Sequence, residues 1–323
     1  MLYPLILAPK LVPLLWGGDA LVSRYGKQGD PNVAIGESWE CWDENRVVNG
    51  EFAGKTIANL RAEIGAELMG QLNSARLFPI LTKFIDARQT LSVQVHPDDA
   101  YARRVEKQPN GKTECWYILE AQPDATIVLG WNRDMSAEEY FKRVKDGTLS
   151  ELLRHVPVKA GDVFYLPAGT LHAIGAGIVL FEVQQTSDLT YRIFDWNRLG
   201  ADGEPRLLHV EKAADVLDFR ASQAGALRTL TRTVEGFERT VLVADSHFTV
   251  ERATIDERER DLRLHGVPMI VTALGDTELR VKGLGVQLKP FETALLPSAL
   301  GSVRIRATDG ATAVLTVTPF SRP

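Results

Sequence analysis

The sequence is poor in the features that mark several common classes of protein. Its 323 residues include only two cysteines, Cys41 and Cys115. Cys115 lies in an apolar and aromatic run, which does not fit the disulfide framework of a small secreted domain. We therefore expect both side chains to be reduced thiols.

An excess of positive charge and long apolar runs are also missing. The formal net charge is -5, so the chain lacks the basic field that nucleic-acid binding needs. No stretch approaches the roughly 18 uninterrupted apolar residues of a membrane span. The apolar start, residues 1–7, has no basic segment before it and is broken by Pro4, unlike a secretory signal. We expect a cytoplasmic protein that binds neither nucleic acid nor membrane.

What is present is typical of a globular, mainly β protein. Hydrophobic residues make up 45% of the chain and charged residues 24%, and the length suits one large or two medium domains. Helical periodicity is confined to residues 56–69 and to 137–145, which a capping box at Ser136 opens. Elsewhere short alternating runs are separated by turn residues, which indicates a sandwich or barrel. The runs are Thr90–Val95, Thr126–Leu129, Val163–Leu166, Ile178–Val183, Phe248–Ala253, Glu278–Val281 and Thr312–Val317.

A weak internal repeat predicts two related barrels. Residues 158–168 resemble residues 288–298, 130 positions further on. A boundary between 220 and 228 would give a metal-binding domain over 1–222, with a small helical insertion, and a second domain over 223–323. The first copy continues to His172, whereas the second has Ser302 at that place. Metal chemistry is therefore expected in the first domain alone.

Three β segments carry side chains suited to metal binding. In an extended strand, residues two apart share a face, so Ser92, Gln94 and His96 lie together, and Lys112 lies with Glu114. For the first segment alone, a solvent-exposed outer face is an equally simple interpretation. His172 follows a turn at the start of a further strand.

Two imidazoles, one carboxylate and the amide oxygen of Gln94 would satisfy a divalent ion and leave room for water or substrate. The predicted ligands are Gln94, His96, Glu114 and His172. One carboxylate cancels only one of the ion's two charges, so the ion could act as a Lewis acid. The other histidines have no comparable context, and we interpret them as surface or packing residues; they are His155, His209, His247 and His265.

The chain resembles the type I mannose-6-phosphate isomerases of the cupin superfamily, in their shorter bacterial form. The motifs that carry the resemblance are Leu14–Gly18, Gly36–Glu40, Leu91–Asp99, Gly111–Glu114, Pro167–Ala173 and Thr190–Trp196. The resemblance implies two cupin-like (jelly-roll) β-barrels and one zinc ion per chain. It also implies that Gln94, His96, Glu114 and His172 are the zinc ligands and that Arg192 is catalytic.

The same resemblance implies an enzyme that interconverts mannose 6-phosphate and fructose 6-phosphate through an enediolate. A base must then remove the C2 proton, and Glu182 or a metal-bound hydroxide could do so. Lys112 and Arg192 are the first choices for cations that act on the substrate, with Ser92 and Lys83 as further binding residues. The expected partner is a small sugar phosphate, and the oligomeric state stays open.

Two other classes of function remain open. Two histidines and a carboxylate also describe the ferrous site of metal-dependent oxygenases, although Gln94, Lys112 and Arg192 do not favour that interpretation. A sugar-binding barrel without catalysis is the third hypothesis. The tryptophans near the N-terminus fit packing better than sugar stacking; they are Trp16, Trp39 and Trp42.

Overall fold

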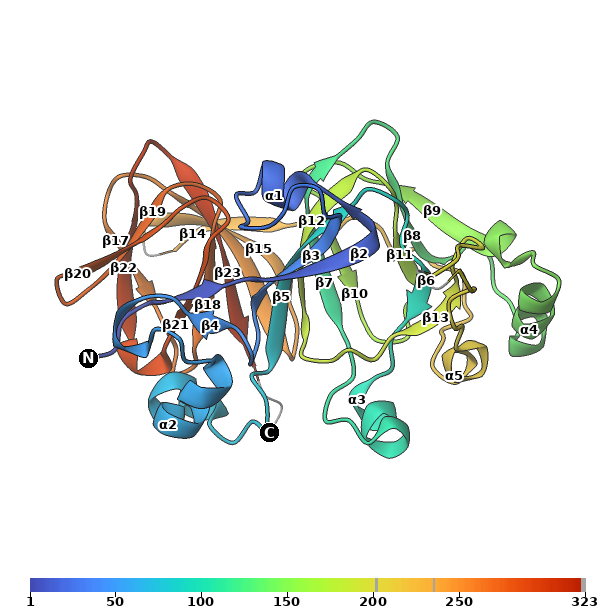
Figure 1. Cartoon of the computed structure of the whole chain (residues 1–323), viewed down its shortest axis with the longest axis horizontal. Coiled ribbons are helices and arrows are strands. Elements are labelled where there is room, and N and C mark those ends of the chain that lie inside the picture. The colour runs from blue at the N-terminus through green and yellow to red at the C-terminus, as the bar shows by residue number, and fades with distance from the viewer. Residues whose placement is uncertain (201–202, 235, 321–323) are drawn as a thin grey trace.

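The chain forms two β lobes joined along their length (Figure 1). The structure is a computed structural model that describes residues 1–200, 203–234 and 236–320. Within these residues, no helix is both long and apolar enough to span a membrane. Cys41 and Cys115 are buried free thiols, as expected.

The first lobe is built from two facing antiparallel sheets. Its inner sheet has the strand order β10-β7-β12-β5-β2-β3, formed by β2 (Lys10–Gly18), β3 (Ile35–Cys41), β5 (Ile80–Ala87), β7 (Glu114–Ala121), β10 (Val163–Leu166) and β12 (Ile178–Gln185). Its outer sheet has the order β13-β6-β11-β8-β9, formed by β6 (Val93–Val95), β8 (Thr126–Trp131), β9 (Leu153–Pro157), β11 (His172–Ile174) and β13 (Tyr191–Phe194).

The second lobe repeats this arrangement. Its inner sheet has the order β14-β15-β16-β23-β18-β21-β1-β4, formed by β1 (Leu5–Ala8), β4 (Arg46–Val47), β14 (Leu230–Val234), β15 (Phe237–Ala244), β16 (Phe248–Ile255), β18 (Met269–Ala273), β21 (Thr293–Leu296) and β23 (Thr312–Pro319). Its outer sheet has the order β17-β22-β19-β20, formed by β17 (Arg260–Arg263), β19 (Thr277–Val281), β20 (Leu284–Leu288) and β22 (Ser302–Ala307).

Four strands of each inner sheet and four strands of each outer sheet are paired in the same order in the two lobes. The segment β10-β7-β12-β5 corresponds to β21-β18-β23-β16, and β6-β11-β8-β9 corresponds to β17-β22-β19-β20. β10 and β21 begin 130 residues apart, at Val163 and Thr293, and so do β11 and β22, at His172 and Ser302. The internal repeat in the sequence therefore corresponds to equivalent strands.

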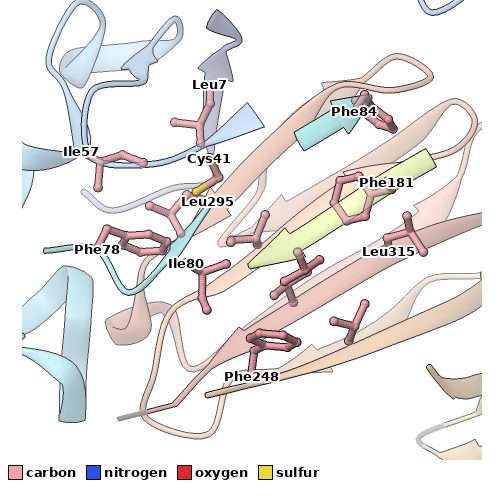
Figure 2. Packing of buried hydrophobic residues seen from close by; sticks show 14 of the residues in the cluster. Leu7, Cys41, Ile57, Phe78, Ile80, Phe84, Phe181, Phe248, Leu295 and Leu315 are labelled. Carbon is pink, nitrogen blue, oxygen red and sulfur yellow. The ribbon is translucent and has the colours of Figure 1, made fainter. Parts of the chain in front are cut away.

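The two inner sheets pack against each other through a shared core. Figure 2 shows Phe84 and Phe181 from the first lobe beside Leu315 from the second, with Phe248 in the same cluster. All residues of β5 and of β12 are buried, because one face of each strand meets this core and the other meets the interior of the first lobe. Strands covered on both faces are expected to read as nearly continuous apolar runs rather than as alternating ones.

Helices lie at the edges of the two lobes. The two helices expected from the sequence are present, α2 (Ile57–Met69) behind a capping box at Thr56 and α4 (Ala137–Lys145) behind Ser136. The shorter ones are α1 (Ala20–Ser23), α3 (Asp99–Tyr101) and α5 (Val210–Ala214). Tyr140 of α4 and Ala213 of α5 cover the outer sheet of the first lobe (Figure 1).

The prediction of a mainly β fold is confirmed, whereas the strand pairings do not establish the predicted pair of barrels. In the described part of the chain no strand pairing closes a sheet into a barrel, so two jelly-roll barrels remain a prediction. The proposed boundary at 222/223 also remains a prediction. β1 lies in the N-terminal segment and yet pairs with β21 of the second lobe.

Candidate active site

Strand register brings the predicted metal ligands together between the two sheets of the first lobe. On the outer sheet, Gln94 of β6 lies opposite His172 of β11 on one side and opposite Arg192 of β13 on the other. Glu114 comes from the inner sheet as the first residue of β7. His96 follows β6 directly. The alternation predicted for residues 92–96 is borne out, because Val93 and Val95 face the opposite side, toward α4 and α5.

The polar atoms of these side chains converge on one point. Glu114 Oε1 lies 3.3 Å from His96 Nε2, and Glu114 Oε2 lies 3.4 Å from His172 Nε2. Gln94 Nε2 is 3.3 Å from His172 Nε2. One ligand atom from each of His96, Glu114 and His172 lies within 4.8 Å of the others. All three side chains are buried, and together they could hold a metal ion.

Backbone carbonyls orient both imidazoles. His96 Nδ1 lies 2.8 Å from the carbonyl oxygen of Leu189, and His172 Nδ1 lies 2.9 Å from that of Thr170. A carbonyl oxygen can only accept, so each Nδ1 carries the proton and donates it. Each Nε2 is then an acceptor beside Glu114, with Lys112 Nζ 3.4 Å from that of His96 and Gln94 Nε2 3.3 Å from that of His172. An unprotonated Nε2 is what a metal-binding histidine needs.

The electrostatics also fit a cation. Burial lowers the pKa of His96 to about 3 and lowers that of His172 as well, so both are neutral at physiological pH. Burial alone would raise the pKa of Glu114, but the positive charge of the nearby Lys112 holds it well below its usual range.

Glu114 itself is short of directed partners. Lys112 Nζ lies 2.6 Å from its Oε1 as an ion pair, yet within the described residues neither carboxylate oxygen accepts a well-directed hydrogen bond. A buried carboxylate in this state, between two neutral imidazoles, is what a divalent ion would satisfy.

A cavity of about 310 Å³ opens beside this cluster, and it is lined by most of the residues that the sequence singled out. Gln94 and Lys112 line it and also contact the cluster, Gln94 at His172 and Lys112 at Glu114. The predicted residues on its wall are Lys83, Ser92, Gln94, Lys112, Glu182 and Arg192. Its size suits a small polar ligand of the kind that concave sites enclose.

On the inner sheet, Glu182 is the central polar residue of the cavity wall. Its Oε1 accepts a hydrogen bond from Trp116 Nε1 at 2.9 Å, and its Oε2 lies 2.9 Å from Lys83 Nζ. Burial and the negative charge of Glu114 raise the pKa of Glu182, although Lys83 works against the shift. Lys83 also approaches Glu37 at 3.6 Å. A carboxylate with a raised pKa in a cavity is a candidate proton acceptor.

On the outer sheet, Arg192 brings positive charge to the opposite wall. Its Nη1 donates to the carbonyl oxygen of Leu207 at 3.0 Å, and within the described residues its buried Nε has no hydrogen-bond partner. Burial, followed by the nearby charge of Arg206, lowers its pKa from the usual value for arginine. Its backbone N–H donates to Nδ1 of His209 at 3.2 Å. Arg192 lines the cavity, and its guanidinium has a donor without a partner among the described residues.

Several wall residues were not singled out as binding residues. Trp16 and Trp39 were expected to serve in packing, yet both line the cavity, together with Glu37, Asp188 and Arg206. Trp39 Nε1 donates to Glu37 Oε2 at 2.6 Å. Arg206 follows β13 in an irregular segment, where no periodicity points toward a site. The sequence motif Gly36–Glu40 contains Trp39, but it does not show whether this side chain lines a cavity or packs in a core.

Comparison with known proteins adds an independent line of evidence. A model of the type I phosphomannose isomerase catalytic domain matches residues 5–117. The mannose-6-phosphate isomerase of Streptococcus mutans is 41% identical over 306 residues, which cover 94% of this chain and 95% of that protein. The crystal structure of the mannose 6-phosphate isomerase from Bacillus subtilis covers 98% of this chain and 99% of its own, with a TM-score of 0.87 and 32% identity.

A more distant structure, a zinc-bound mannose 6-phosphate isomerase, has a TM-score of 0.77 and 17% identity and covers 98% of this chain and all of its own. That likeness shows the fold alone. The fold, the cavity and the buried His-Glu-His cluster describe a mainly β protein with a candidate metal site. On the identity and coverage of its relatives, the chain belongs to the type I mannose-6-phosphate isomerase family.

Proposed function

We propose that this protein is a metal-dependent sugar-phosphate isomerase that interconverts mannose 6-phosphate and fructose 6-phosphate. The observation that carries the proposal is the placement of a buried His-Glu-His cluster beside a cavity that holds both a carboxylate with a raised pKa and several cations. Aldose–ketose isomerisation needs these three elements, namely an electrophile, a proton acceptor and a grip on the phosphate.

The metal proposed for the cluster is zinc, one ion per chain, on Gln94, His96, Glu114 and His172. Two imidazole nitrogens, a carboxylate and an amide oxygen are donors that suit zinc, which could expand its coordination to take a water or substrate oxygen as well. When bound, the ion would supply a Lewis-acidic charge that stabilises negative charge on the substrate's oxygen. Lys112 keeps Glu114 ionised from 2.6 Å, and it also lines the cavity, where its ammonium can donate to a substrate oxygen.

Glu182 is proposed to move the proton. In the aldose-to-ketose direction its carboxylate takes the proton from C2, and the C–H electron pair forms the C1–C2 double bond of the enediolate. The proton then returns at C1, while the proton of the C2 hydroxyl passes to O1, which leaves a carbonyl at C2 and a hydroxyl at C1. Trp116 and Lys83 hold the two oxygens of Glu182 from different sides, which fixes the carboxylate for this transfer. Burial raises its pKa, which makes it a stronger base than an exposed carboxylate.

The remaining cations are proposed to hold the charged end of the substrate. Arg192 presents a guanidinium whose Nε has no partner within the described residues, and Arg206 lies on the same cavity wall. Guanidinium groups bind phosphate oxygens through parallel hydrogen bonds. Ser92 adds a hydroxyl donor and Lys83 a further positive charge. Arg192 is also placed to stabilise charge that develops on the enediolate.

A coupled isomerase assay tests the proposal directly. The purified protein is assayed with a small panel of hexose and pentose phosphates, before and after treatment with a chelator and again after zinc is added back. We expect turnover of mannose 6-phosphate that the chelator removes and zinc restores. Oxygen consumption by the metal-loaded protein would favour an oxygenase, and ligand binding without turnover would favour a sugar-binding protein.

A further inference from the structure

Two side chains outside the cavity tie together the segments that carry the metal ligands. We propose that Asp99 and Gln185 are positioning residues: they fix the turn 111–113 against the segment 96–99, and so set where Lys112 and Glu114 stand relative to His96. The inference rests on the proposed function for its catalytic consequences, but the contacts that carry it do not depend on a bound metal or substrate.

Asp99 accepts two hydrogen bonds on one carboxylate oxygen. Its Oδ1 lies 2.8 Å from the backbone nitrogen of Gly111 and 2.9 Å from Gln185 Nε2. Asp99 follows His96 by three residues, and Gly111 precedes Glu114 by three. One carboxylate oxygen therefore bridges the two ligand-bearing segments.

Gln185 completes the bridge from β12. Its Oε1 accepts a hydrogen bond from the backbone nitrogen of Thr113 at 3.0 Å, while its own backbone nitrogen donates to the carbonyl oxygen of Thr113 at 3.2 Å. Gln185 and Thr113 are both buried, so loss of the side-chain bond would leave a buried N–H without a partner. Thr113 follows Lys112 in the chain, and neither Gln185 nor Thr113 lines the cavity beside the His-Glu-His cluster.

The backbone is packed as closely as a glycine allows. The nitrogen of Lys112 donates to the carbonyl oxygen of Pro97 at 3.0 Å. A Cβ on Gly111 would come within 2.4 Å of that same oxygen and within 2.6 Å of the nitrogen of Asp99. The turn can lie this close only because residue 111 has no side chain. The segment that carries His172 is attached to the same assembly. The carbonyl oxygen of His96 accepts a hydrogen bond from the backbone nitrogen of Gly169 at 2.9 Å, and Gly169 precedes His172 by three residues.

The second oxygen of Asp99 has different and weaker partners. Its Oδ2 lies 3.2 Å from Arg103 Nη2, on an exposed side chain, and 3.9 Å from His247 Nε2 of the second lobe. Asp99→Asn can therefore keep the oxygen that serves Gly111 and Gln185, and it replaces only the oxygen that faces Arg103 and His247. Asp99→Leu removes both carboxylate oxygens, and with them the hydrogen bonds to Gly111 and Gln185.

The experiment compares four variants: Gln185→Met, Asp99→Leu, Asp99→Asn and Asp98→Ala. Gln185→Met keeps the length of the side chain but removes its donor and its acceptor. Asp98→Ala is the matched control. Its carboxylate caps α3 through the nitrogen of Tyr101 at 2.7 Å, so the same segment is perturbed without loss of a contact to the turn 111–113.

Zinc affinity is measured by competition with a chromophoric chelator, and kcat and KM are measured separately. Supporting residues around metal sites typically change metal affinity by about 10- to 100-fold. We expect a loss of this size, together with a lower kcat, in Gln185→Met and Asp99→Leu. Asp99→Asn should regain most of both, and Asp98→Ala should keep zinc affinity within about 3-fold of the parent.

Amide hydrogen exchange of residues 109–116 in the metal-free protein provides a readout that needs neither zinc nor turnover. Exchange there should be faster in Gln185→Met and Asp99→Leu than in the parent or in Asp98→Ala. If the parent failed to isomerise sugar phosphates, the proposed function would fall while this comparison would still decide the inference. Unchanged exchange in Gln185→Met, or losses of zinc affinity in Asp98→Ala equal to those in Gln185→Met, would overturn it.

Discussion

The two lobes share the pairings of four inner and four outer strands, but their equivalent positions hold different chemistry. Gln94 lies opposite His172, and Arg263 lies opposite Ser302 in the matching strands of the second lobe. Glu114 lies opposite Leu166, and Met269 lies opposite Leu296. The second lobe therefore has a cation in place of the amide, a thioether in place of the carboxylate and a hydroxyl in place of an imidazole.

One of the predicted ligand positions holds a histidine in both lobes. His96 stands two residues after Gln94, and His265 stands two residues after Arg263. His96 is buried beside Glu114, whereas His265 is exposed. An equivalent position in the backbone is therefore not enough for a metal site, which also needs a group of buried donor atoms. This difference supports the prediction that the second lobe binds no catalytic metal.

The sharpest way to break the comparison is to exchange residues between the lobes. His172→Ser places the side chain of the second lobe at the corresponding position of the first. We expect bound zinc and isomerase activity both to fall to the detection limit, because an open coordination shell loses one of its few ligands. Metal analysis and the coupled assay measure the two losses, and full zinc occupancy would refute the ligand assignment.

The reverse exchange, Ser302→His, is the control. It should gain no metal, because Arg263 and Met269 still occupy the equivalent positions, and activity should stay at the level of the parent.

Glu182→Gln tests the proton acceptor, which lies on an inner strand of the first lobe. A general base typically contributes about 10² to 10⁴ in rate, and we expect kcat to fall within that range while zinc stays bound. The base must be deprotonated, so activity is lost as the pH falls through its pKa.

Because burial raises that pKa, the acid limb of the kcat/KM profile should lie above about 4.3, the ordinary glutamate value. The limb should disappear in Glu182→Gln. Zinc content measured across the same pH range separates this effect from loss of metal. If the acid limb were unchanged in the variant, a group other than Glu182 would be the base.

Arg192→Ala tests the cation on the outer sheet. A charge that acts only in the transition state lowers kcat and kcat/KM together, whereas uniform phosphate binding mainly raises KM. We expect kcat to fall by on the order of 10² or more, the scale seen when a positioned electrostatic donor is lost. Lysine should restore only part of the rate, because it lacks the planar fork. A normal kcat with a raised KM would reassign Arg192 to binding.

Much of the fold and of the site could be predicted because the relevant signals are local. Alternation placed Gln94 and His96 on one face, and the repeat placed the starts of equivalent strands 130 residues apart, as β10 and β21 are. The pairing of β1 with β21 could not be predicted in this way. It joins Leu5 to Leu295, and no local periodicity encodes a partner so distant in sequence.

The missed wall residues have the same explanation. Arg206 reaches the cavity from an irregular segment, where neither helical nor strand spacing constrains the direction of a side chain. Trp39 alternates along β3 in a way that fits a core as well as a cavity. Only the packing of β3 beside β5, where Trp39 lies opposite Lys83, decides between them.

The smallest expected effect on activity sharpens the comparison from the other direction. Met269 is 4% exposed and packs in the apolar core of the second lobe. Met269→Glu would place there the residue that its equivalent in the first lobe carries. Glu114 is tolerated because Lys112 and two histidines surround it, but Met269 lies among apolar side chains.

An uncompensated buried charge costs about 3–5 kcal/mol, so we expect the free energy of unfolding of Met269→Glu to fall by an amount of that order, or less if the new carboxyl stays protonated. Denaturant unfolding at neutral and at acidic pH measures this. The loss should shrink as the pH falls, since protonation removes the buried charge. The kcat of the fraction that remains folded should be normal. A stability equal to that of the parent would mean that the second lobe can accommodate a carboxylate, and its lack of metal ligands would then need a reason other than packing.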